Sequence, residues 1–167
     1  MSQPRPQEAA ASIRMMHAGD RPGLLAILEA TRAFHPAEIQ VALELIDFAL
    51  ERPGQTDYHF RCLDLGGRLA GYMCYGQVPL SDRCWDLYWI AVDPALHGRG
   101  LGRSLIACME EDLRERRARK ILIETGGKSS YGPTRRFYES AGYAEIARIP
   151  GFFAPGDDKV IFGKDLA

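Results

Sequence analysis

The sequence predicts a single α/β domain whose mixed, mostly antiparallel central sheet is flanked by helices. Three observations lead to this prediction. A length of 167 residues suits one domain with a substantial hydrophobic core. Strand-like and helix-like segments follow one another in the order β-α-α-β-β-β-α-β-α-β-β, with hairpins around one crossover. No repeat or linker interrupts residues 12–167, which follow a lead-in over residues 1–11 that we expect to be disordered.

The first part of the domain predicts one strand and two helices. Residues 12–16 form a short apolar strand pattern. Asp20 is placed to cap the first helix, and Pro22 suits its first turn. His35-Pro36 interrupts the helical pattern, and a second helix is expected from about residue 37 to residue 51.

The middle of the domain predicts a hairpin followed by a third strand. Residues 58–65 and 68–78 read as antiparallel strands that turn at Gly66-Gly67. Residues 85–92 read as the next strand, which leads directly into a glycine-rich segment. This order places the glycines at the end of a strand.

The last part predicts a helix, a buried strand, a short helix and a closing pair of strands. The helix after the glycines carries an apolar stripe at four-residue spacing, made of Leu101, Leu105, Met109 and Leu113. The remaining strands are expected over residues 121–125, 143–149 and 158–164.

The segment from Asp93 to Ser104 indicates a phosphate-containing ligand. Gly98, Gly100 and Gly102 lie where a strand passes into the start of a helix. Free backbone N–H groups and the positive end of the helix dipole attract an anion there, and glycine lets the backbone approach it closely. The segment lacks the lysine of a Walker loop and the third glycine of a dinucleotide fingerprint. A glycine turn that serves packing alone is the ordinary alternative.

The spacing of this loop resembles that of the GNAT superfamily of acyl-CoA-dependent N-acyltransferases. Their loop reads Gln/Arg-x-x-Gly-x-Gly/Ala and holds the pyrophosphate of coenzyme A. His97, Gly100 and Gly102 occupy the corresponding positions here, and His97 departs from the usual Gln or Arg. The resemblance implies the GNAT fold.

A second segment, residues 131–143, is similar to the other GNAT signature, a short helix ending in Tyr-Glu-x-x-Gly-Phe/Tyr. Gly142 suits the position after the helix that requires a positive φ. The resemblance implies that Tyr138 donates a proton to the departing sulfur of coenzyme A. Tyr131 stands where the family often has Asn. Packing beside Phe137 is the structural alternative for Tyr138.

The resemblance implies acetyl-CoA as co-substrate. The residues expected to bind it belong to the strand end, the glycine-rich segment and the short helix. They are Ile90, Ala91, Val92, His97, Gly98, Arg99, Gly100, Leu101, Gly102, Arg103, Ser104 and Tyr131. Backbone N–H groups near residues 90–92 are expected to stabilise the developing oxyanion.

Acyl transfer to an amine requires a neutral amine and therefore benefits from a base. Asp86 is the first candidate, because it lies at the start of the strand that enters the glycine-rich segment. A solvated carboxylate at a strand end is its alternative. Glu124 is the second candidate, because it interrupts an apolar run and needs either a partner, such as an arginine, or a role.

The resemblance implies that Phe34, which precedes the break between the first two helices, faces the acceptor side. Phe152 and Phe153 are also expected there. The last two lie in residues 150–158, which read as a loop with adjacent aromatic and acidic residues. Such a loop could face a cationic amine or simply make a turn and close the core.

Composition narrows the partners and the setting. A net charge of −1 argues against nucleic acid or an anionic membrane as a partner. No apolar run reaches the ~20 residues of a membrane span, and no signal peptide is recognised. The four histidines and four cysteines lack metal-ligand spacing, so no metal is expected. Reduced thiols favour a cytoplasmic protein.

The predicted function is N-acetyl transfer from acetyl-CoA to a primary amine by direct attack. The amine belongs to a small molecule or to a protein, and a homodimer is left open. The alternatives are a catalytically silent module that binds acyl-CoA and, more remotely, a nucleotide-binding protein that uses the same anion site.

Overall fold

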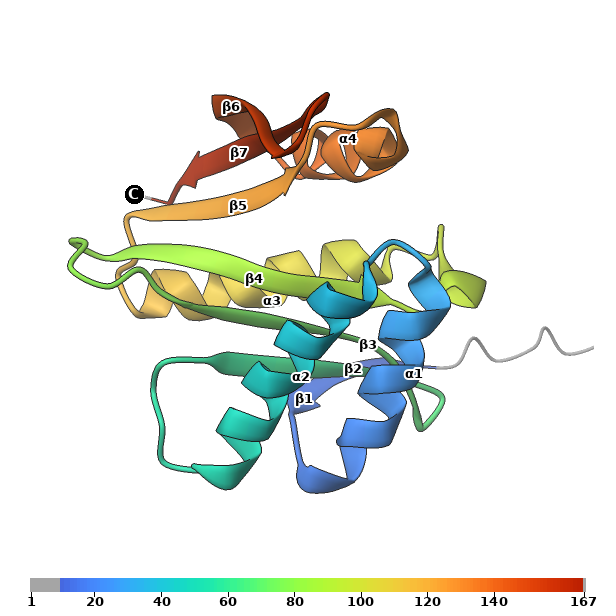
Figure 1. Cartoon of the computed structure of the whole chain (residues 1–167). Coiled ribbons are helices and arrows are strands. Elements are labelled where there is room, and N and C mark those ends of the chain that lie inside the picture. The colour runs from blue at the N-terminus through green and yellow to red at the C-terminus, as the bar shows by residue number, and fades with distance from the viewer. Residues whose placement is uncertain (1–9, 167) are drawn as a thin grey trace, which may run out of the picture.

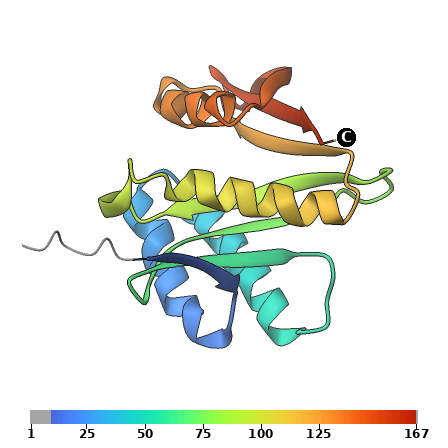
Figure 2. The same cartoon turned by 180° about the vertical axis from the view of Figure 1, so that it is seen from behind.

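The computed structural model describes residues 10–166 and contains a single sheet of seven strands with helices on both faces (Figures 1 and 2). The strands are β1 (Ala11–Met15), β2 (His59–Leu65), β3 (Arg68–Gln77), β4 (Cys84–Val92), β5 (Lys120–Gly126), β6 (Ala144–Ala154) and β7 (Asp157–Asp165). The helices are α1 (Arg21–Thr31), α2 (Pro36–Glu51), α3 (Leu101–Glu115) and α4 (Gly132–Ser140). Short 3₁₀ turns are η1 (Ala18–Asp20), η2 (Pro94–Leu96) and η3 (Ser129–Tyr131).

The strand order is β1-β2-β3-β4-β5-β7-β6. Only β4 and β5 run parallel, and every other neighbouring pair is antiparallel. The helix α3 makes the crossover between β4 and β5. The predicted α/β class, element order and mostly antiparallel sheet are therefore confirmed.

Two hydrophobic cores lie on opposite faces of the sheet. The helices α1 and α2 cover one face of β1 to β4, and α3 packs on the other face (Figures 1 and 2). The predicted apolar stripe of α3 is buried, as Leu101, Leu105, Met109 and Leu113 show. Tyr138 of α4 joins the same core as α3. No helix among residues 10–166 is long and apolar enough to cross a membrane.

Two expected boundaries differ from the structure. Residues 150–154, expected in a loop, are the second half of β6, and the chain turns only at Pro155-Gly156. Pro150 is compatible with a strand here because β6 is an edge strand with a register shift after Ile149. Ala11 already belongs to β1, whereas residues 1–9 of the expected lead-in lie outside the described residues.

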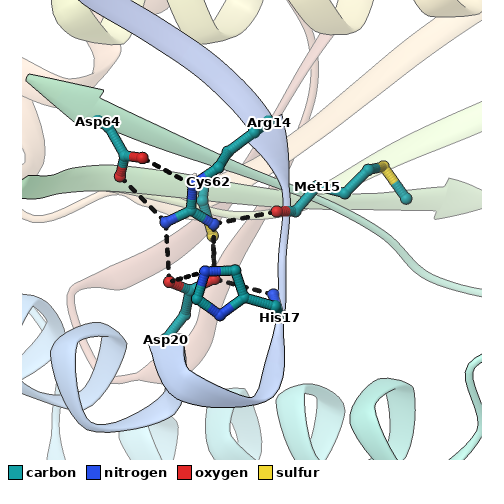
Figure 3. A network of polar contacts seen from close by, with 6 residues as sticks. All are labelled: Arg14, Met15, His17, Asp20, Cys62 and Asp64. Carbon is teal, nitrogen blue, oxygen red and sulfur yellow. Dashed lines mark hydrogen bonds and ion pairs between the residues drawn. The ribbon is translucent and has the colours of Figure 1, made fainter. Parts of the chain in front are cut away.

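A polar network joins the start of α1 to the sheet (Figure 3). The guanidinium of Arg14 donates to both carboxylate oxygens of Asp20 at 2.8 and 2.9 Å, and to those of Asp64 at 2.6 and 3.1 Å. Asp20 also accepts from the backbone N–H of His17 at 2.9 Å. It occupies the cap position of α1 but its side chain makes no cap hydrogen bond, because it faces Arg14 instead.

The charge of Asp20 should contribute to the stability of the fold, because the carboxylate is buried and paired. We expect Asp20→Asn to lower the free energy of unfolding by about 2–3 kcal/mol in urea denaturation. Asp47→Asn is the matched control. It removes the ion pair with Arg21, in which the side chain of Asp47 is 38% exposed and that of Arg21 is 41% exposed. The free energy of unfolding should fall by less than about 1 kcal/mol. Equal losses in the two variants would contradict this role.

The same variant should change the acid sensitivity of the protein. Burial alone raises the pKa of Asp20, but hydrogen bonds from Arg14 and from the His17 N–H outweigh it and hold the pKa below the ordinary 3.8. The stabilisation is therefore complete above that ordinary value and is lost as the pH falls through the lower folded value. The stability difference between wild type and Asp20→Asn should narrow below about pH 4, and a constant difference would argue against it.

Candidate active site

The strands β4 and β5 pair over only part of their length. Residues Cys84–Leu87 are in register with Lys120–Ile123, and the pairing between the two strands ends there. One extra residue in β4, Tyr88, shifts its register against β3 between Trp89 and Leu87. Such a bulge increases local twist and turns the rest of β4 away from β5.

A cleft of about 840 Å³ occupies the space where the two strands part. Its floor is β4 from Leu87 to Val92, and its walls come from β5, the loop between α1 and α2, the start of α4 and the β6–β7 hairpin. The β5 side of Tyr88–Val92 has no strand partner within the described chain. Backbone N–H and C=O groups there remain available to a ligand.

The glycine loop, residues 97–104, forms a second cavity of about 530 Å³ between the ends of β4, α3 and α4. Gly98 and Gly100 have φ values of 79° and 77°, in the left-handed region that favours glycine. Gly100 is the N-cap residue of α3. Because glycine has no side chain to accept a cap hydrogen bond, the first N–H groups of the helix stay free. This geometry suits an anion.

Gly102 is not required for its backbone conformation, because its φ is not positive. A Cβ atom at this position would lie 3.2 Å from the ring of Phe137 in α4. Glycine therefore lets α3 and α4 approach closely beside the second cavity.

The residues expected to bind a cofactor divide into two groups. Ten line one or both cavities, namely Ile90, Ala91, Val92, His97, Gly98, Gly100, Leu101, Gly102, Arg103 and Tyr131. Arg99 and Ser104 line neither, and the Ser104 hydroxyl donates back to the carbonyl of Gly100 at 3.3 Å. His97 lies against its own loop, with Nε2 3.0 Å from the carbonyl oxygen of Val92.

Tyr138 belongs to the hydrophobic core and also lines the large cleft. Its ring lies 5.4 Å from that of Phe137 and 5.9 Å from that of Phe162, centroid to centroid. Its hydroxyl has no hydrogen-bond partner among residues 10–166, and only 5% of the residue is exposed. Burial raises the pKa of Tyr138 well above its ordinary value, so the hydroxyl keeps its proton.

Glu124 and Asp86 lie close together on the face of the sheet opposite α3. Glu124 lines the cleft, is 52% exposed and pairs with Lys159 of β7 at 2.8 Å. Asp86 is half-buried where β4 still pairs with β5, and it does not line the cleft. Burial and the charge of Glu124 raise the pKa of Asp86 to about 6, although Lys159 opposes this. The structure thus gives Glu124 a lysine partner rather than an arginine.

The aromatic residues expected on the acceptor side are placed differently. Phe34 lines the cleft and packs edge-on against Trp89 at 5.2 Å. Phe153 also lines it, whereas Phe152 does not and instead lies under the Lys159 ammonium at 4.0 Å.

Sequence reasoning missed several residues of the cleft, among them Tyr88, Trp89, Thr134 and Asp157. Tyr88 and Trp89 belong to the strand that was correctly identified. The bulge makes it impossible to assign their faces from simple alternation. Within residues 10–166 no cluster of His, Cys, Asp and Glu has the arrangement of a metal site.

Comparisons with known proteins agree with this geometry. The family model of the acetyltransferase (GNAT) family matches residues 24–143. A solved GNAT-family protein from Desulfovibrio desulfuricans is 39% identical, with a TM-score of 0.91 over 95% of this chain and 100% of that one. No curated protein matches the sequence.

More distant solved structures share the fold and carry the cofactor. A protein from Salmonella typhimurium solved with acetyl-CoA is 19% identical, with a TM-score of 0.72 over 95% of each chain. An aminoglycoside 6'-N-acetyltransferase in complex with coenzyme A is 14% identical, with a TM-score of 0.72 over 93% of this chain and 97% of that one. From the family match and the 39% identical relative, we conclude that the chain belongs to the GNAT family of acetyltransferases.

Proposed function

We propose that the protein transfers an acetyl group from acetyl-CoA to a primary amine, which attacks the thioester directly. The observation that carries this proposal is that the two cavities are adjacent and share a wall. Ile90, Ala91, Val92, His97 and Thr134 line both of them. One ligand can therefore extend from the anion site at the start of α3 to the hydroxyl of Tyr138.

The chain's own residues fit coenzyme A at both ends of this path. The free N–H groups at the start of α3 suit the pyrophosphate, and Arg103 adds positive charge there. The free edge of β4 suits an extended arm that carries amide groups, because its own backbone groups lack a strand partner on that side. Acetyl-CoA supplies the activated acetyl group.

The thioester end of acetyl-CoA would lie among groups that can stabilise negative charge and donate a proton. Backbone N–H groups on the free edge near Ile90–Val92 can donate to the thioester oxygen as negative charge develops on it. Tyr138 keeps its proton at neutral pH and has no protein partner, so it can donate to the departing sulfur.

Deprotonation of the amine requires a base on the acceptor side. A lysine-like amine has a pKa near ~10.4, so under about one part in a thousand is neutral at pH 7. We assign the base to Asp86, acting through water, because its raised pKa makes it a better proton acceptor than an ordinary carboxylate. Glu124 is the alternative, since it lines the cleft directly.

We also propose that the protein is cytoplasmic and that, where it associates, it forms a homodimer. The four cysteines carry free thiols, which supports a reducing compartment. The edge strand β6 is exposed along most of its length and presents Ile146 and Ile149, which supports contact with a second copy.

A silent acyl-CoA-binding module is the second candidate, because His97 departs from the usual loop residue and lies against Val92. Incubation with acetyl-CoA and a panel of primary amines separates the two. Release of free thiol that depends on the amine supports the transferase. Coenzyme A binding without thiol release on any amine would overturn it.

Replacing Tyr138 by Phe removes the proposed proton donor and keeps the ring. We expect kcat to fall about a hundredfold, while the Kd for coenzyme A measured by calorimetry changes less than about twofold. Tyr143→Phe is the matched control, because this neighbouring tyrosine bonds Glu110 and does not line the cleft. Its kcat should remain near that of the wild type. Equal rates for wild type and Tyr138→Phe would contradict the assignment.

The pH dependence of kcat/KM distinguishes the two candidate bases. The base must be ionised, so activity should rise with pH through a value near 6, the pKa of Asp86. Asp86→Asn should remove that inflection and lower the plateau, whereas Glu124→Gln should lower the pKa of Asp86 by removing a neighbouring negative charge. An inflection that survives in Asp86→Asn and disappears in Glu124→Gln would assign the base to Glu124.

A further inference from the structure

A hydrogen bond joins two walls of the large cleft. The hydroxyl of Tyr131, in the turn before α4, donates to the backbone carbonyl of Ala33, in the loop between α1 and α2, at 3.2 Å. Both residues line the cleft, and 98 positions separate them in the chain. We call this contact the Tyr131 bridge. It joins the wall beside β5 to the wall beside α1.

The bridge lies on the acceptor side of the cleft. A Cβ atom on Gly126 would come within 2.7 Å of the Tyr131 ring, so the ring lies against the end of β5. Side chains alternate along a strand, which places this contact on the same face of β5 as Glu124. Ile121 and Ile123 face the core beneath α3 on the other side. The bridge is thus on the face opposite α3.

Both ends of the bridge are held in place. Arg135 donates to the carbonyls of Gly126 at 2.7 Å and Lys128 at 2.9 Å, which fixes the turn before Tyr131. Across the cleft, the Ala33 N–H donates to the Thr31 hydroxyl at 3.3 Å.

The chain also turns sharply beside Ala33. Arg32 has a φ of 51°, which is uncommon for a residue with a side chain. Phe34 packs on Trp89 directly after this turn. The carbonyl of Ala33 is therefore presented to Tyr131 by a loop anchored on both sides.

The cleft that the bridge spans has a group of aromatic residues in its lining. Phe34, Tyr88, Trp89 and Phe153 line it together with Tyr131. Glu124 lies in the same lining and Asp86 next to it, and both carboxylates face the ammonium of Lys159. Glu38 and Asp157 also line the cleft and are balanced by Arg32 and Lys128, so one carboxylate remains in surplus. Aromatic faces and a surplus carboxylate attract a cationic amine on an apolar body.

We propose that the acceptor is a slender primary amine with an unbranched carbon next to nitrogen and an aromatic or alkyl body. The Tyr131 bridge excludes the α-amines of polypeptide N-termini, making Tyr131 a specificity-determining residue. At a peptide N-terminus the carbon next to the amine carries the backbone and, except in glycine, a side chain, and the bridge obstructs this branched group. This inference rests on the proposed acetyl transfer and specifies its substrate class.

The test compares phenethylamine with an alanine-initiated tetrapeptide in the thiol-release assay. Wild type should prefer phenethylamine. Tyr131→Ala removes the ring and should raise the ratio of kcat/KM for the peptide over phenethylamine by about tenfold or more. Tyr131→Phe keeps the ring and loses the hydrogen bond, so its ratio should fall between the two. An unchanged ratio in Tyr131→Ala, or a wild-type preference for the peptide, would overturn the proposal.

Two further measurements make the outcome specific. Gly126→Ala should shift the same ratio in the same direction, because its methyl group displaces the Tyr131 ring. The Kd for coenzyme A tests the other role expected of Tyr131. A tenfold weaker Kd in Tyr131→Ala with an unchanged ratio would make Tyr131 a cofactor residue and refute the bridge. Failure of the proposed function looks different, because wild type would then release no thiol with any amine.

Discussion

The site depends on one constraint, the loss of pairing between β4 and β5 after Leu87. Unpaired backbone groups in a sheet interior are costly, so a protein leaves them open only where something else satisfies them. The bulge at Tyr88 directs the end of β4 away from its neighbour, and the crossover helix α3 begins after η2 and the glycine loop that follow that end. The free strand edge and the free N–H groups at the helix start consequently form one polar track. No side chain is needed to create it, because it is made by backbone geometry.

Close packing of α3 against α4 holds the two ends of this track at a fixed distance. Gly102 allows the ring of Phe137 to reach α3, and the adjacent Tyr138 is fixed by Phe162 of β7. The start of α3 and the ring of Tyr138 are therefore tied to the same hydrophobic core. This placement matters for the role proposed for Tyr138, because a proton donor contributes only when it lies within hydrogen-bond reach of the atom that receives the proton.

The sequence predicted the order of elements and the glycine loop well, because these features rest on local rules. Apolar periodicity identified α3, and the positive φ of Gly142 followed from its place after a helix. The remaining features depend on register and long-range contact. Lys159 meets Glu124 through the pairing of β5 with β7, and Tyr131 meets Ala33 across the cleft. Pro150 and Gly151 look like turn residues in sequence, and only the edge position of β6 lets a strand continue through them. Tyr88 changes the alternation of β4 because β3 leaves it without a partner.

Leaving polar groups without partners beside the cleft lowers stability, and the rest of the fold must offset this loss. The hydroxyl of Tyr138 and the carboxylate of Asp86 both lack protein partners in the described chain, which is unfavourable for half-buried or buried polar groups. Compensation must come from regions far from the cleft. The Arg14 network satisfies two carboxylates at the far edge of the sheet, and it anchors the start of α1, whose other end supports the cleft wall at Ala33 (Figure 3). Strong polar pairing at the far edge of the sheet therefore accompanies unsatisfied groups beside the cleft, as expected when a fold is stable enough to leave polar groups without partners at its candidate active site.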